Sequence, residues 1–143
     1  MCKHPNMFQQ AVILAVAAHQ DQVDKSGVPY ILHPMVVASR CETEDERVVA
    51  VLHDIVEDTE ITSESLMDLF PDRIVKAVDA ITHRKGEPYD QYIERVLKNF
   101  TATQVKIQDV GHNMERIDFI KDQQTKERLI GKYKYALEIL IKK

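Results

Sequence analysis

Apolar residues recur at steps of three and four along most of the chain, and this spacing constrains the fold more than any other feature. Such a period places the apolar residues on one face of an α-helix. The 143 residues include only four glycines, and no run shows the alternation of apolar and polar residues that is typical of a half-buried strand. The sequence therefore predicts an all-α fold, a compact single-domain bundle of about seven or eight helices.

Length, composition and charge limit the organisation and the partners. Single domains usually contain about 100–150 residues, so residues 1–143 are expected to form one domain. With 44% hydrophobic and 29% charged residues, the chain can build a buried core and a solvated surface. The net charge of −4 argues against a surface-wide attraction to nucleic acid or anionic membranes. No nucleic-acid or membrane partner is expected, although a local basic pocket is allowed.

Capping and helix-breaking residues divide the apolar pattern into separate helices. The first is expected from about residue 5 to residue 24, with Val16, His19 and Val23 near its apolar face, and the second from 34 to 40. Thr43 and Glu46 form a capping box that opens a third helix running through residue 56. Further helices are expected at about 62–70, 71–81, 89–98, 103–119 and 125–141.

Cysteine usage and the first apolar stretch indicate the cellular setting. Cys2 and Cys41 are too few for a disulfide framework and lack the spacing of a zinc ribbon, so a reducing cytoplasm is expected. The apolar residues 11–18 follow Lys3 but are short for a signal peptide and far short of the ~20 residues that span a bilayer. We interpret this stretch as a helix of the fold.

Four protic side chains lie within six positions of the predicted third helix: His53, Asp54, Glu57 and Asp58. At helical spacing, Glu57 follows His53 by four residues and Asp54 by three, so these groups share a side. Carboxylates held this close repel one another unless a cation binds or a proton is retained. The alternative is an acidic helix end exposed to solvent, and spacing alone leaves both interpretations open.

His33 and Asp109 are candidate ligands from other parts of the chain. His33 precedes Pro34, which restricts the local backbone. Asp109 follows the apolar Val105 and Ile107, and a buried carboxylate there needs a partner. Two imidazoles and two carboxylates would make a mixed nitrogen and oxygen site for a first-row divalent ion. A lone histidine is more often structural, and the wide separations along the chain do not establish such a site.

The segments around these residues resemble the HD-domain phosphohydrolases, and among them the hydrolase domain of the Rel/SpoT alarmone enzymes. The matching segments occur in family order: residues 18–22, KSGVPYILHP at 25–34, LHDIVEDT at 52–59, ITH at 81–83, and VKIQD at 105–109 with Asn113. An isolated His-Asp pair is weak evidence. The long HDxVEDT string together with GxPYxxHP is specific.

The resemblance implies an HD-type helical fold with one divalent metal ion, typically manganese. The implied metal ligands are His33, His53, Asp54 and Asp109. The implied catalytic residues, which assist the attacking water and the leaving group, are Glu57 and Asp58. The implied substrate-binding residues are Lys25, Ser26, Lys106 and Asn113. The reaction is the release of pyrophosphate from the 3′ position of guanosine tetra- or pentaphosphate, and no synthetase activity is expected because 143 residues leave no space for a second catalytic domain.

Departures from the family pattern keep other hypotheses open. Asp24 stands where the Rel/SpoT hydrolases usually have an arginine that stacks on guanine, and an acid cannot supply that contact. Residues 108 and 110–112 also differ from the usual run around Asp109. The metal chemistry is therefore better supported than guanine specificity. The alternatives are an HD phosphohydrolase for another nucleotide or phosphate ester, and a non-catalytic nucleotide-binding module.

Several polar residues receive a simpler interpretation. His19 is expected to be a packed, hydrogen-bonded histidine rather than a ligand, and Arg84 and Lys85 are expected to be solvated surface charges. His112 has no assigned role. Apolar positions on the last helix would allow a homo-oligomer, and the mixed ligand set would accept manganese, iron, cobalt or zinc.

Overall fold

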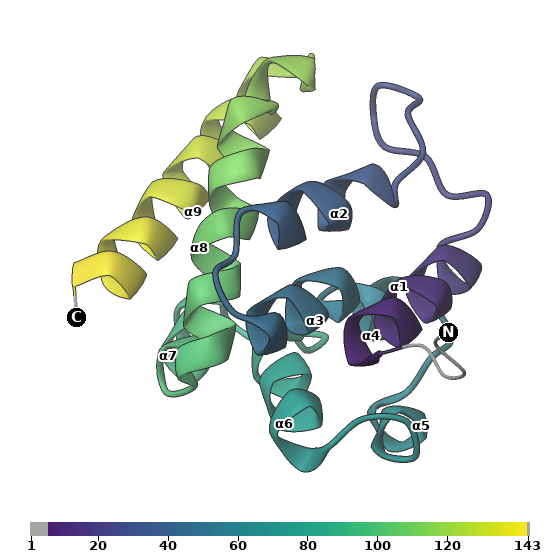
Figure 1. Cartoon of the computed structure of the whole chain (residues 1–143). Helices are drawn as coiled ribbons and strands as arrows, with labels where there is room; N and C mark the ends of the chain where they lie inside the picture. Colours follow the sequence, from purple (N-terminus) through teal and green to yellow (C-terminus); the bar gives the residue numbers. More distant parts are fainter. Residues whose placement is uncertain (1–5, 143) are drawn as a thin grey trace.

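The computed structural model describes residues 6–142, apart from the side chain of Lys142, and its regular elements in this range are all helical (Figure 1). Cys2 and the expected helix start at residue 5 lie outside the described residues. The helices are α1 (Met7–Ala18), α2 (Leu32–Ser39), α3 (Glu44–Leu52), α4 (Ile55–Asp58), α5 (Ser63–Met67), α6 (Asp72–Ile81), α7 (Tyr89–Leu97), α8 (Phe100–Glu115), the 3-10 helix η1 (Ile117–Phe119) and α9 (Gln123–Lys142). The predicted all-α fold is confirmed. The count exceeds the expected one because the expected third helix is divided into α3 and α4, and η1 follows α8 as a separate element.

Helix α3 forms the centre of the fold. Its residues 48–52 are all fully buried, and it packs against α1, α2, α6 and α8. A helix that is apolar on every side belongs in the interior. Thr43 caps its amino end by accepting a hydrogen bond from the Glu46 amide. Because α3 ends inside the protein, the residues that follow it are delivered to the interior.

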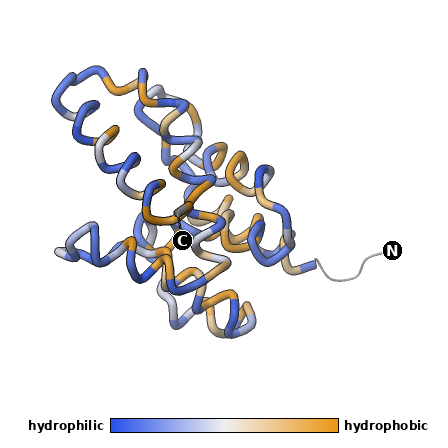
Figure 2. The backbone as a smooth tube through the Cα atoms, turned by 90° about the vertical axis from the view of Figure 1, so that its left-hand side faces the viewer, coloured by the Kyte–Doolittle hydropathy of each residue, from blue (hydrophilic) through white to orange (hydrophobic). Residues whose placement is uncertain are grey.

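The long helices α8 and α9 run side by side and close one flank of the bundle (Figure 1). Helix α8 also packs against α2, α3, α6 and α7. Hydrophobic and hydrophilic segments alternate along the helices, as Figure 2 shows. This alternation is typical of helices that bury one face. None of the helices between residues 6 and 142 is long and apolar enough to cross a membrane.

Helix α1 ends at Ala18, earlier than the expected end near residue 24. The chain turns at Asp21, whose φ of 70° is incompatible with a continuing right-handed helix. Residues 22–30 then fold back on themselves, with a single antiparallel bridge between Val23 and Pro29. The expected apolar face is therefore wrong for Val16 and Val23, which are exposed. The fully buried face of α1 is made by smaller residues, Ala11 and Ala15.

The expected continuous helix through residue 56 is also wrong, because the chain breaks between α3 and α4. Asp54 has φ −105° and ψ 2°, outside the helical region. The His53 ring contributes to this break, since its Nδ1 donates to the carbonyl oxygen of Ala50 at 2.6 Å. The break separates His53 and Asp54 from the short helix that carries Glu57 and Asp58.

The expected helix at 103–119 starts earlier and ends earlier than predicted. Asn99 caps α8 by accepting from the Ala102 amide at 2.9 Å, so helix begins at Phe100 rather than after a polar link. The helix ends at Glu115, and the residues up to Phe119 form η1. This early end places Ile117 and Phe119 near residues 23–26, since both segments line one cavity.

Candidate functional site

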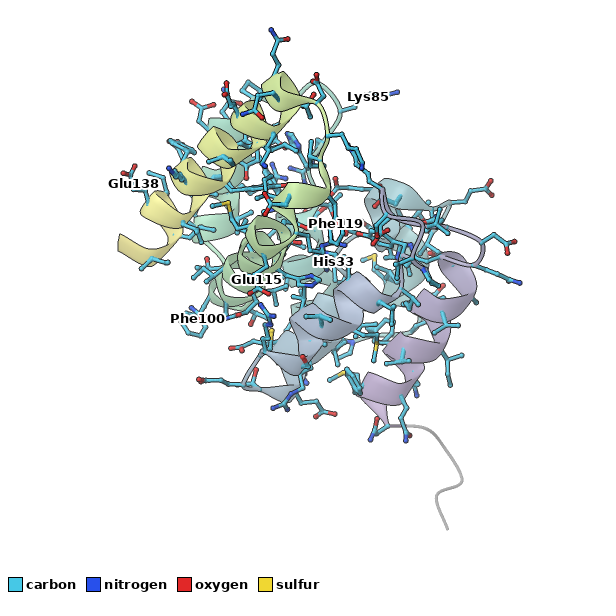
Figure 3. All side chains as sticks on the ribbon, turned by 90° about the horizontal axis from the view of Figure 1, so that it is seen from above. His33, Lys85, Phe100, Glu115, Phe119 and Glu138 are labelled. Carbon is cyan, nitrogen blue, oxygen red and sulfur yellow. The ribbon has the colours of Figure 1, made fainter. Side chains whose placement is uncertain are left out.

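Three buried side chains from three helices converge at the centre of the protein. His33 comes from α2, His53 follows α3, and Asp109 comes from α8. The Oδ1 atom of Asp109 lies 2.8 Å from Nε2 of His33 and 3.2 Å from Nε2 of His53. One ligand atom from each residue lies within 4.8 Å of the others. In Figure 3, His33 lies inside the bundle, whereas the labelled Lys85 and Glu138 lie at its periphery.

This donor set fits a divalent first-row metal ion. Two imidazole nitrogens and a carboxylate oxygen are ligands that such ions accept. The other ring nitrogens are engaged elsewhere, as ligating histidines require. Nδ1 of His53 donates to Ala50, and Nδ1 of His33 lies 2.8 Å from Nδ1 of His112.

His112 is a site residue that the sequence left without a role. Its ring stacks on that of His33, with centroids 5.0 Å apart and planes 11° apart. It follows Asp109 by three residues, so both project from one face of α8. This helical spacing is the signal that would have found it.

Asp54, the fourth predicted ligand, lies beside the cluster of three. Its Oδ2 atom is 3.2 Å from Nε2 of His53 and accepts a hydrogen bond from the Tyr30 hydroxyl. Burial opposes ionisation of Asp54, but the charge of His53 and these hydrogen bonds lower the pKa of its carboxyl. Asp54 is therefore an ionised carboxylate at the edge of the candidate metal centre.

Two predicted substrate-binding residues contact Asp109 instead of facing open solvent. Lys106 donates to Oδ2 of Asp109 at 3.0 Å, and Asn113 donates to Oδ1 at 3.3 Å. They precede and follow Asp109 by one helical turn on α8. Burial opposes the charge on Asp109, yet the ammonium of Lys106 and the ring of His53 hold its pKa well below the usual range.

Glu57 lines a polar cavity of about 200 Å³. The cavity is also lined by His33, Asp54, Asp109 and Lys106. The side chain of Glu57 accepts a hydrogen bond from the His83 amide at 3.2 Å. Desolvation and the charge of Asp54 raise the pKa of Glu57 to about 7. A carboxyl group with this pKa exchanges protons readily near neutral pH.

Asp58 lies outside the lining of this cavity. Burial and the charge of Asp54 raise the pKa of its carboxyl, while the imidazole of His19 lowers it. Its backbone carbonyl accepts from the side chain of Gln22, which also pairs with Nδ1 of His19 at 2.9 Å. The expectation of a packed, hydrogen-bonded His19 is confirmed, since the residue is 3% exposed.

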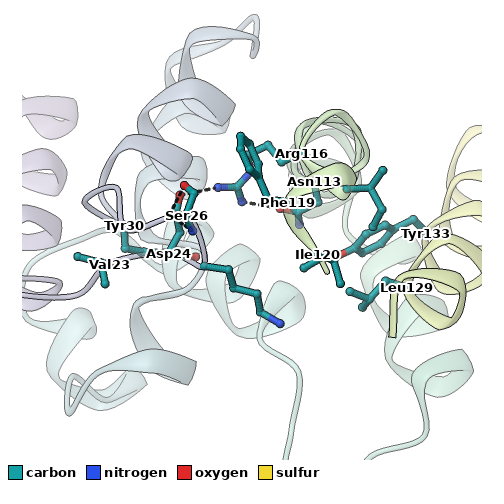
Figure 4. Close-up of a pocket in the computed structure, with 12 residues that line it drawn as sticks. Val23, Asp24, Ser26, Tyr30, Asn113, Arg116, Phe119, Ile120, Leu129 and Tyr133 are labelled. Carbon is teal, nitrogen blue, oxygen red and sulfur yellow. Dashed lines mark hydrogen bonds and ion pairs between the residues drawn. The ribbon is translucent and has the colours of Figure 1, made fainter. Parts of the chain in front are cut away.

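A second, larger cavity of about 490 Å³ adjoins the polar one (Figure 4). The loop that holds Lys25 and Ser26 forms one side, and η1 and α9 form the other. Tyr30, Asn113 and Arg116 line both cavities. Of the predicted substrate-binding residues, Lys25 and Ser26 line the larger cavity, Lys106 lines the polar one, and Asn113 lines both.

Asp24 and Arg116, which both line the larger cavity, form an ion pair. The Oδ2 atom of Asp24 lies 3.3 Å from Nη1 of Arg116, whose Nη2 donates to Asn113 at 2.9 Å (Figure 4). The other oxygen of Asp24 accepts from the amides of Ser26 and Val28 and from the Ser26 hydroxyl. A guanidinium therefore reaches this cavity from the end of α8, although position 24 is acidic.

Arg84 and Lys85 line neither cavity. Arg84 pairs with Asp79 at 3.0 Å, and both lysine and arginine side chains are exposed. The expectation that they are surface charges is confirmed.

A family model described as "HD domain" matches residues 11–90, more than half of the chain. This chain belongs to the HD domain family. The match contains His33, His53, Asp54 and Glu57, so the family assignment covers most of the candidate metal centre. The family recognised from the sequence motifs is thereby confirmed.

Relatives of this HD domain are found among long alarmone enzymes. It is 28% identical to a GTP pyrophosphokinase of Myxococcus xanthus, with 84% of this chain aligned to 19% of that protein. It is 31% identical to a probable guanosine-3′,5′-bis(diphosphate) 3′-pyrophosphohydrolase of Synechocystis, with 86% aligned to 18%. The chain spans about a fifth of the length of these relatives.

A solved structure has the same fold as this HD domain. Its title reads "A metazoan ortholog of SpoT hydrolyzes ppGpp and plays a role in starvation responses", and it aligns with a TM-score of 0.84. The alignment covers 98% of this chain and 88% of the other at 22% identity. The HD-type helical fold expected from the sequence is confirmed over nearly the whole chain.

Added manganese should stabilise the metal-stripped protein. A ligand at 100 times its Kd that binds only the native state contributes about 2.7 kcal/mol, which corresponds to a rise in Tm of roughly 5–10 °C for a domain of this size. Asp109→Asn should remove most of this rise in differential scanning fluorimetry. Glu115→Gln, an exposed change on the same helix, should preserve it. An equal rise in wild type and Asp109→Asn would show that the metal binds elsewhere.

The raised pKa of Glu57 predicts a pH-dependent stability. The folded-state pKa lies above the ordinary value of 4.5, so the wild type gains stability at low pH and loses it as pH rises through about 7. Glu57→Gln should therefore stabilise metal-free protein at pH 8 by about 1 kcal/mol, a figure reduced because solvent reaches this side chain. At pH 5 the gain should shrink. Urea unfolding at both pH values measures the gain in the free energy of unfolding. An equal gain at pH 5 and pH 8 would contradict the raised pKa of Glu57.

Proposed function

We propose that this HD domain is a metal-dependent pyrophosphohydrolase that releases pyrophosphate from the 3′ position of guanosine tetra- or pentaphosphate. The observation that carries the proposal is the buried cluster of His33, His53 and Asp109. His33 and Asp109 line one cavity together with Glu57, and this cavity adjoins a larger one. The name of the Synechocystis relative and the solved structure's title, which refers to ppGpp hydrolysis, support this substrate.

In this proposal, His33, His53, Asp54 and Asp109 hold one divalent ion, for which we propose manganese. When bound, such an ion lowers the pKa of water and polarises a phosphoryl oxygen. The second nitrogens of both histidines are fixed by Ala50 and His112, and both Nε2 atoms lie beside Oδ1 of Asp109, so these three atoms would hold the ion.

Glu57 is proposed to take the proton from the attacking water. It lines the cavity with the metal ligands, and its pKa near 7 suits a group that must accept and return a proton. Asp58 is proposed to assist at the leaving group. Its support is a carboxyl whose pKa is raised by burial and by Asp54.

The larger cavity is proposed to hold the nucleoside. Its walls combine the apolar Ile117 and Leu129 with the ring of Tyr133, and Lys25 and Ser26 lie at its polar side. A planar guanidinium stacks on aromatic rings and binds phosphate. Arg116 therefore offers the cationic contact that Asp24 cannot, and it supports a nucleotide substrate in this cavity.

A second candidate is the hydrolysis of another nucleotide or phosphate ester by the same centre. Asp24 favours it, because a carboxylate lines the nucleoside cavity where the Rel/SpoT hydrolases usually have an arginine. A non-catalytic nucleotide-binding module is less well supported, because it has no need for four ligands and two acids together. We further propose a cytoplasmic protein without nucleic-acid partners. An exposed Ile141 on α9 is compatible with a homo-oligomer.

The proposed activity is tested by assaying pyrophosphate release from guanosine tetraphosphate by metal-stripped protein, with and without manganese. NADPH and nucleoside mono- and triphosphates are assayed beside it. We expect manganese-dependent cleavage of the tetraphosphate to be faster than that of any other compound. Preferred cleavage of another compound would refute the substrate, and binding without turnover under any divalent metal would favour the non-catalytic module.

Substitutions of the two proposed catalytic acids should lower turnover without weakening metal binding. Glu57→Gln and Asp58→Asn should each lower kcat by about 10²–10⁴, the usual contribution of a positioned acid or base. Manganese affinity should change little, because neither residue is a proposed ligand. Glu60→Gln, an exposed change just after α4, is the control and should retain wild-type kcat. Full activity in both variants would refute the proposed proton transfers.

A further inference from the structure

Helix α9 contributes one lysine to the polar cavity, outside the segment matched by the family model. Lys132 lines the cavity together with His33, Asp109 and Glu57. Its ammonium lies over the ring of Tyr89, 4.8 Å from the centroid. Such a cation–aromatic contact fixes the direction of a flexible lysine without neutralising its charge.

The other cations at this site already have acidic partners. Lys106 pairs with Asp109 at 3.0 Å, and Arg116 pairs with Asp24 at 3.3 Å. Within residues 6–142, Lys132 has no acidic partner in an ion pair or hydrogen bond. Lys132 is therefore a half-buried cation in the cavity lining whose charge is available to pair with a bound anion.

The surroundings of Lys132 disfavour its charged form. Burial and the positive charges of Lys106 and Arg128 lower the pKa of its ammonium, and Glu57 and Asp109 only partly oppose them. A bound anion would remove this cost, because an opposite charge stabilises the ionised form of a partly buried group. The cavity therefore combines acidic residues with an ammonium that has no acidic partner.

We propose that Lys132 binds the terminal phosphoryl group of the pyrophosphate that the enzyme releases. This inference rests on the proposed function. In that reaction the oxygen of water bonds to the phosphorus attached to the 3′ oxygen, and the bond between that phosphorus and the 3′ oxygen breaks. The electron pair leaves with the 3′ oxygen, which takes up a proton. The reacting phosphoryl group belongs beside the metal ligands, so its terminal neighbour needs a second cation in the cavity, and Lys132 supplies it.

The chain provides a matched control for this lysine. Lys134 lies two residues further along α9 and is exposed, so Lys132→Gln and Lys134→Gln remove the same charge from the same helix. Lys132→Arg keeps the charge and the contact with Tyr89. Circular dichroism and Tm establish that each variant is folded.

Two measurements test the inference: the Kd of inorganic pyrophosphate in the presence of manganese, by isothermal titration calorimetry, and the KM for guanosine tetraphosphate. Lys132→Gln should weaken pyrophosphate binding and raise KM by about tenfold or more, since hydrogen bonds to charged groups contribute about 1.5–3 kcal/mol. Lys132→Arg should recover most of the affinity, and Lys134→Gln should match wild type.

The outcomes separate this inference from the proposed function. Wild-type pyrophosphate affinity in Lys132→Gln would overturn the role of Lys132, even if the tetraphosphate is cleaved. A second outcome is that Lys132→Gln loses pyrophosphate affinity while the wild type does not cleave the tetraphosphate. This outcome would refute the proposed substrate and uphold the contact between Lys132 and phosphate. If Lys132→Gln does not fold, the inference is tested by the pyrophosphate affinity of Lys132→Arg and by the salt dependence of pyrophosphate binding to wild type. Affinity in wild type that does not fall with salt would overturn the inference.

Discussion

The carboxylate of Asp109 is the interaction on which the rest of the site depends. It meets His33, His53 and Lys106 in the interior, so it ties α2, the end of α3 and α8 to one point. Burying a charge is costly unless it is paired and hydrogen-bonded. Here every partner is a group that a metal site or a phosphate site also needs. The same contacts that make the carboxylate tolerable in the core therefore prepare the centre for a cation.

The break after α3 follows from the same requirement. A continuous helix would spread His53, Asp54 and Glu57 along one helical face. The turn instead sends His53 into the core, where Ala50 fixes its ring, and leaves Glu57 in the lining of the polar cavity. In the proposed reaction, a cavity shared by metal ligands and the proton-accepting group is useful, because water and a phosphoryl group must fit into it. The broken helix thus serves function at the expense of local regularity.

The sequence revealed the parts of this site that depend on local spacing and motif. The apolar period predicted the helices, and the HDxVEDT and GxPYxxHP strings located His33 and His53. The break at Asp54 was missed because a helical period cannot show that a side chain will hydrogen-bond to the preceding turn. The pair between Asp24 and Arg116 joins residues 92 positions apart, which no local pattern reveals. Lys132 was missed for the same reason, since its meaning depends on which face of α9 meets the cavity.

The charges of the cavity connect the metal ion and the substrate in the proposed reaction. The charge of Asp54 opposes ionisation of Glu57, whereas the charges of Lys106 and Arg128 oppose the protonated form of Lys132. Each ligand relieves a repulsion and also attracts the other ligand, because they lie in one small cavity of low dielectric. Coupling between two binding events is reciprocal. Under the proposed function, the metal ion and the polyphosphate would therefore each bind more tightly in the presence of the other, and this would favour the complex in which the proposed reaction occurs.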